Sequence, residues 1–159
     1  MAKNSAELSQ EFSQQATDFA ELVRGLSDEQ WQATTAEEGW SVGTVAHHVG
    51  ASFESTFGLC GLMIADNVPS ISLDDIHAGN AAHAEEHASP DKAETLALIE
   101  QSTATVTDGL ASLSDDDLDA AAVVPAFGPD PLPVRNWIEM VVIGHIGMHR
   151  GSIEGAIGS

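Results

Sequence analysis

The sequence has little cysteine, few basic residues and no long apolar run, and each shortage excludes a class of protein. The single cysteine, Cys60, excludes an internal disulfide framework and a cysteine-rich zinc site. The chain has only five Lys and Arg residues but 25 Asp and Glu residues, which gives a formal net charge of −20. Nucleic acids and anionic membranes attract basic surfaces, so we expect neither as a partner. Any metal site must use histidine and carboxylate ligands.

The length of 159 residues suffices for a hydrophobic core, and we expect residues 1–159 to form a single domain. No apolar run reaches the roughly 20 residues of a transmembrane helix. The N-terminal residues lack the apolar segment of a signal peptide, which predicts a cytoplasmic protein.

Apolar residues recur with a helical period in four long stretches of the chain. These stretches cover residues 4–25, 41–65, 90–113 and 134–156. Ser41 is the expected N-cap of the second helix, and Ser89 followed by Pro90 is a strong start signal for the third. No stretch shows a convincing strand pattern. The sequence therefore predicts an all-α fold, a four-helix bundle with a long connection between the second and third long helices.

The connections between the long helices contain shorter elements. Ser27 and Ser114 each precede acidic residues and can cap a short helix. Residues 73–87 can form another short helix within the long connection. The prolines of residues 120–134 exclude regular structure throughout that loop.

Two histidines, His145 and His149, lie four residues apart in a mostly apolar stretch near the C-terminus. On a helix this spacing places both imidazoles on one face, about 6 Å apart along the axis, so both can bind one ion. The alternative is a pair of core histidines that hydrogen-bond to carbonyl groups. A third ligand elsewhere in the chain would favour the metal.

The second long helix supplies two candidates for that third ligand, His47 and His48. His48 shares a helix face with Val45, while His47 is turned about a quarter-circle away, so only one of them is expected to face inward. Helical bundles build metal sites from facing helices, so His48 can meet His145 and His149. Three imidazoles leave one coordination position open, as in catalytic zinc sites.

A further pair with the same spacing, His83 and His87, lies among alanine and glutamate residues. We interpret this segment as an exposed, solvated surface, and a weak adventitious metal site is the alternative. Asn80, on the same stretch, can cap a helix or line a pocket, and the sequence favours capping.

Two segments carry a resemblance to a known family. They are Trp40-Ser41-Val42-Gly43-Thr44-Val45-Ala46-His47-His48 and, about a hundred residues later, His145-Ile146-Gly147-Met148-His149-Arg150-Gly151. This arrangement resembles the DinB-like superfamily of metal-binding four-helix bundles. In the family pattern the first ligand stands eight residues after the tryptophan. The resemblance implies that His48, His145 and His149 bind the metal and that His47 is a bystander.

Members of this superfamily include S-transferases that use bacillithiol or mycothiol, and the resemblance implies similar chemistry here. A divalent ion, zinc or nickel, held by three histidines would activate a low-molecular-weight thiol for attack on a small-molecule electrophile. With water in place of the thiol, the protein would be a metal-dependent hydrolase. A metal-binding stress protein without catalytic activity is the third alternative. The resemblance also implies a homodimer.

Three other residues have less specific interpretations. Arg150 can bind a substrate carboxylate or pair with one of the many acidic side chains, and Asn80 is the other candidate for substrate binding. Cys60 lies roughly 120° around the helix from His48, which predicts a buried apolar environment away from the metal.

Overall fold

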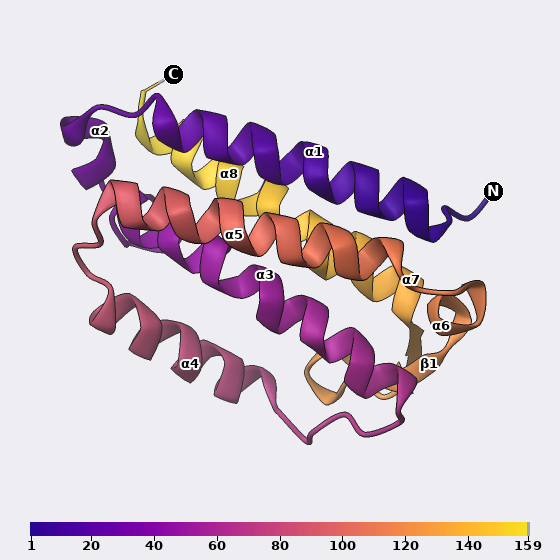
Figure 1. Ribbon diagram of the computed structural model, residues 1–159. Coiled ribbons are helices and arrows are strands. Elements are labelled where there is room, and N and C mark those ends of the chain that lie inside the picture. Colours follow the sequence, from indigo (N-terminus) through magenta and orange to yellow (C-terminus); the bar gives the residue numbers. More distant parts are fainter. Residues whose placement is uncertain (159) are drawn as a thin grey trace.

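Four long helical segments pack side by side in the computed structural model, which describes residues 1–158 (Figure 1). They are α1 (Ser5–Arg24), α3 (Val42–Ile64), α5 (Lys92–Ala111) and a last segment made of α7 (Val134–Trp137), η2 (Ile138–Ile143) and α8 (Gly144–Ala156). Helix α1 contacts α5 and α8, and helix α3 also contacts α5 and α8. The predicted four-helix bundle is confirmed.

Side chains at the helix starts explain several boundaries. Asn4, Ser27 and Ser114 form capping boxes with the third residue of α1, of α2 (Asp28–Gln32) and of α6 (Asp115–Asp119), respectively. Ser41 caps α3 as predicted. The prediction for α5 was wrong, because Asp91 and not Ser89 is its N-cap. The Asp91 carboxylate accepts a hydrogen bond from the backbone N–H of Glu94 at 2.9 Å.

The core of the bundle is built from large apolar side chains of all four long segments. Phe12, Phe53, Ile99, Ile146 and Ile153 are almost completely shielded from solvent. The rings of Phe12 and Phe53 meet edge to face with centroids 5.1 Å apart, which joins α1 to α3. Burial of each such side chain stabilises the fold by about 1.5–3 kcal/mol. Within residues 1–158, no helix combines the length and apolar character that a bilayer crossing requires.

The long connection contains α4 (Leu73–Glu86), which runs beside α3 on the outside of the bundle (Figure 1). None of the residues of α4 is buried. Asn80 lies in the middle of this helix and Ser72 is the N-cap, so the prediction that Asn80 caps a helix was wrong. Since α4 supplies nothing to the core, its attachment to the bundle depends on surface contacts.

The proline-rich loop, residues 120–134, contains a small hairpin that no strand pattern in the sequence indicated. Strand β1 (Ala121–Val123) pairs antiparallel with β2 (Pro131–Pro133), with Ala122 opposite Leu132. The 3-10 turn η1 (Pro125–Phe127) lies between them. Prolines at both ends of β2 are tolerated because a two-stranded sheet has only edge strands.

The last helical segment widens at η2, which has the hydrogen-bond pattern of a π-helix over six residues. The N–H of Gly144 reaches back to the carbonyl of Glu139, five residues earlier. A turn of this kind holds more residues than an α-helical turn, so it sets the direction of the side chains that follow. Those side chains include His145 and His149.

One glycine of α3 is required by close packing. A Cβ at Gly43 would lie 2.6 Å from Cε2 of Trp31, whose Nε1 donates a hydrogen bond to the carbonyl of Pro90 at 3.0 Å. We expect Gly43→Ala to lower the free energy of unfolding by about 1–3 kcal/mol, because the indole must move. Gly61, on the same helix, faces open space. Gly61→Ala should stabilise the protein by about 0.5–1 kcal/mol. Urea denaturation of both variants tests this, and equal effects would contradict it.

Candidate metal centre

Three histidines from two helices meet inside the bundle, and we call them the inner triad. They are His48 of α3 and His145 and His149 of α8. The Nε2 atom of His145 lies 3.2 Å from that of His48 and 3.0 Å from that of His149. His48 and His149 are each 6% exposed. The structure thus brings together the three residues that the sequence singled out as metal ligands.

The two contacts of His145 Nε2 cannot both be ordinary hydrogen bonds. Each nitrogen–nitrogen hydrogen bond needs one N–H and one lone pair, and a neutral imidazole has one of each. The Nε2 atom of His145 cannot be donor to one neighbour and acceptor from the other. Two nitrogens bound to one ion at about 2.0–2.1 Å lie roughly 3 Å apart, as these do. The donor set therefore suits a metal ion.

Glu38 fixes the orientation of His149. Its Oε1 lies 2.8 Å from Nδ1 of His149, so the proton of that imidazole belongs on Nδ1 and the lone pair on Nε2. Glu38 reaches this position from a tight turn between α2 and α3, where Thr35 N donates to the carbonyl of Trp40 at 2.8 Å. Gly39 has φ of 71°, a conformation that suits glycine.

The Glu38 carboxyl is held in its charged form. Burial raises its pKa, but the hydrogen-bonding groups of Thr35, His149 and Ser152 outweigh burial and bring the pKa below its usual range. Only the contact with His149 has full hydrogen-bond geometry. The second oxygen, Oε2, is buried and has no hydrogen-bond partner among residues 1–158. No sequence pattern indicated a role for Glu38, because it lies in a polar loop without periodicity.

Burial keeps two of the three imidazoles neutral. Desolvation, with smaller contributions from His149 and His83, lowers the pKa of His48 to about 4, although Glu38 opposes the shift. Desolvation, His149 and His48 lower the pKa of His145 to about 3. Neutral imidazoles are the form that binds metal ions, so these two ligands need no deprotonation near pH 7.

The inner triad borders a cavity of about 760 Å³, a usual size for a small-molecule site. Its walls are largely apolar and come from α3, α4, the last helical segment (α7, η2 and α8), the proline-rich loop and the connections on either side of α3. They include Trp40, Leu59, Val68, Ile76, Val124, Phe127, Trp137, Val141 and Met148. The polar side chains at the wall are the inner triad, Glu37, Glu38, Ser52, Ser55 and Thr56 on the bundle side, and His77 and Asn80 on the α4 side.

Of the other candidate site residues singled out in the sequence, only Asn80 lies at the cavity. Asn80 lines the cavity from α4. Arg150 points elsewhere: its Nε donates to Oε1 of Glu154 at 2.8 Å, and it is not among the described residues that line the cavity. Cys60 is 1% exposed in the core, and burial raises the pKa of its thiol to about 12, in agreement with a purely apolar role.

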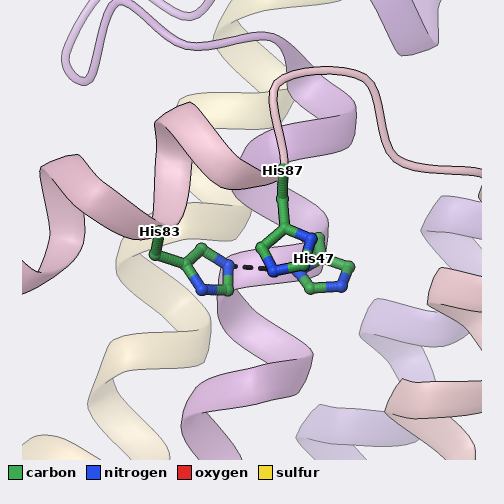
Figure 2. Close-up of side chains that lie close together, drawn as sticks. All are labelled: His47, His83 and His87. Carbon is green, nitrogen blue, oxygen red and sulfur yellow. Dashed lines mark hydrogen bonds between the residues drawn. The ribbon is translucent and has the colours of Figure 1, made fainter.

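Three further histidines form a second cluster between α3 and α4, which we call the outer triad (Figure 2). It consists of His47, His83 and His87, all half-buried. The interpretation of His83 and His87 as freely solvated side chains was wrong, because both contact His47. His47 is likewise in contact with other histidines, on the side of α3 that faces α4.

Comparison with known proteins places this geometry in context. A family profile described as the DinB superfamily matches residues 11–153. No protein in a search of curated sequences matches the chain. The solved structure of YfiT from Bacillus subtilis, described as a probable metal-dependent hydrolase with an unusual four-helix bundle topology, superposes with a TM-score of 0.78. The match covers 96% of this chain and 85% of YfiT at 19% sequence identity, which is evidence for a shared fold.

The contact between Glu38 and His149 predicts an effect on metal affinity. Glu38→Ala should weaken binding of zinc about 10- to 100-fold, because the imidazole loses the acceptor that fixes its tautomer. Glu37→Ala, which removes an exposed carboxylate at the adjacent position, is the matched control. Competition with a chromophoric chelator measures both affinities. An equal loss in the two variants would indicate a general charge effect.

The lowered pKa values of His48 and His145 predict a pH dependence of the metal-free protein. An unfolded imidazole has a pKa of about 6.5, so between pH 7 and about 4 the unfolded chain binds protons that the folded chain does not. The free energy of unfolding should therefore fall as the pH is lowered through this range. His48→Gln should reduce the slope, which denaturation at several pH values can measure. Identical slopes in parent and variant would contradict the assignment.

Proposed function

The chain belongs to the DinB superfamily, and from that premise we propose that it is a metal-dependent thiol S-transferase. The observation that carries the proposal is the convergence of three histidine Nε2 atoms at the wall of a cavity of about 760 Å³. Such a cavity has room for a low-molecular-weight thiol of the mycothiol or bacillithiol type beside an electrophile. The cytoplasmic location and the homodimer stay predictions from the sequence.

A zinc or nickel ion held by the inner triad would lower the pKa of a thiol. After its proton leaves to solvent, the sulfur can bond to an electrophilic carbon as a leaving group such as chloride departs with its bonding electron pair. Glu38 holds the Nδ1 proton of His149 and so presents the Nε2 lone pair to the site. Trp40 and Val141 contribute apolar walls that limit the access of water. The Asn80 amide, on the α4 side, can hydrogen-bond a polar part of the thiol.

A metal-dependent hydrolase is the second candidate, and one observation favours it. Glu38 Oε2 is buried, charged and free of hydrogen-bond partners among residues 1–158, and its side chain lines the cavity. A small rotation of the carboxylate that exposes this oxygen to the cavity would let it take a proton from a water molecule. The two functions therefore differ in whether the nucleophile entering the site is a thiol or water.

Conjugation assays distinguish these functions. Zinc- or nickel-loaded protein is incubated with bacillithiol, mycothiol or cysteine and the electrophile monochlorobimane, and the S-conjugate is measured by mass spectrometry. We expect the parent to form the S-conjugate. In His149→Ala the rate of conjugation should fall at least about 100-fold, because loss of a metal ligand should cost no less than loss of a group that merely orients a ligand. Gln14→Ala, on the exposed side of α1 and away from the cavity, is the control that should keep full activity.

The assay has two contrary outcomes. Hydrolysis of an activated ester by the metal-loaded parent, lost in His149→Ala and without any thiol conjugate, would replace the transferase by the hydrolase. A parent that binds metal yet catalyses neither reaction would leave a metal-binding protein without catalytic activity.

A further inference from the structure

Six of the seven histidines of the chain belong to the two triads, and the proposed function uses only the inner one. In the outer triad, Nδ1 of His47 lies 3.0 Å from Nε2 of His83. The ring of His87 stacks on that of His47 with centroids 4.0 Å apart, and it lies 4.6 Å from the ring of His83. One nitrogen of each residue falls within 4.8 Å of the other two (Figure 2).

The local chemistry of the outer triad suits a divalent transition metal. Imidazole nitrogens are good ligands for zinc, copper and nickel. His83 lies in the last turn of α4 and His87 is the C-cap of that helix, with ring centroids 4.6 Å apart, and His47 faces them from α3. The carboxylate of Glu86 is close enough to act electrostatically on both His47 and His83. A cation here would therefore meet three ligands and a nearby negative charge.

The attachment of α4 is the second observation. This helix has no buried residue, yet its side chains Ile76, His77, Asn80 and Ala81 form one wall of the cavity. A helix without core contacts is expected to open easily. The outer triad lies where the C-terminal end of α4 meets α3. A metal ion bound by all three histidines would therefore hold α4, and with it the α4 wall of the cavity, against α3.

We propose that His47, His83 and His87 form a second divalent-metal site, separate from the inner triad, that fastens α4 to α3 and so completes the wall of the cavity. The two sites share no ligand, although His47 and His48 are adjacent in sequence. Coordination requires the stacked rings of His47 and His87 to turn toward a common point. Both side chains are half-buried at the surface, which leaves room for that rotation.

Zinc stoichiometry tests the proposal. The protein is stripped with a chelator, dialysed against buffered free zinc, and analysed for metal per chain by mass spectrometry. We expect two ions in the parent, one in His83→Ala and one in His87→Ala. His77→Ala is the matched control, because His77 is the exposed histidine of α4 outside both triads, and it should keep two ions. His149→Ala should keep one ion, and the double variant His83→Ala, His149→Ala should bind none.

Hydrogen exchange of the α4 amides gives a readout that an unspecific surface ion would not change. Zinc should slow exchange across 73–86 several-fold in the parent and in His149→Ala, but not in His83→Ala. The proposal is overturned if the parent binds one ion that His149→Ala removes, or if His83→Ala retains two ions. Zinc binding at the outer triad without slower exchange in α4 would overturn its fastening role. Loss of thiol transfer alone would leave all of these results unaffected.

Discussion

The convergence of three imidazole Nε2 atoms, whose contacts cannot all be ordinary hydrogen bonds, is the constraint on which the rest of the structure depends. Two helices must be held at a fixed separation for His48 to reach His145, and the apolar core provides this through residues such as Phe53 and Ile146. Glu38 then adds direction, because a carboxylate at one edge of His149 leaves only the opposite edge free for a ligand. Packing sets the distance between the two helices, and one hydrogen bond sets the orientation of His149.

The consecutive histidines of α3, His47 and His48, point into two different environments. Successive residues on a helix are about 100° apart, so His48 enters the bundle while His47 faces α4. The cavity lies between these two environments, with the rigid bundle on one side and a helix without core contacts on the other. This arrangement gives the site a fixed reactive side and an adjustable opposite wall.

The sequence predicted the features that depend on local pattern. The four long helices followed from the spacing of apolar residues, and several helix starts followed from capping serines. The meeting of His48 with His145 and His149 followed from helix geometry together with a family resemblance. Features that depend on contacts between distant, irregular segments were missed. Glu38 comes from a turn, and the outer triad needs α4 to fold back onto α3, which no periodicity in the sequence indicates.

The π-helical segment η2 lies between α7 and α8. The directions in which the side chains of α7 and α8 point are therefore set separately. Upstream, Trp137 is tied to α3 by a hydrogen bond from its Nε1 to the carbonyl of Thr56 at 2.8 Å. Downstream, Ile153 anchors α8 in the core. A continuous α-helix between these anchors would turn one part by up to about 100° for each residue gained or lost. The wide turn accommodates such a mismatch, so both anchors can stay in place while His145 and His149 keep facing His48.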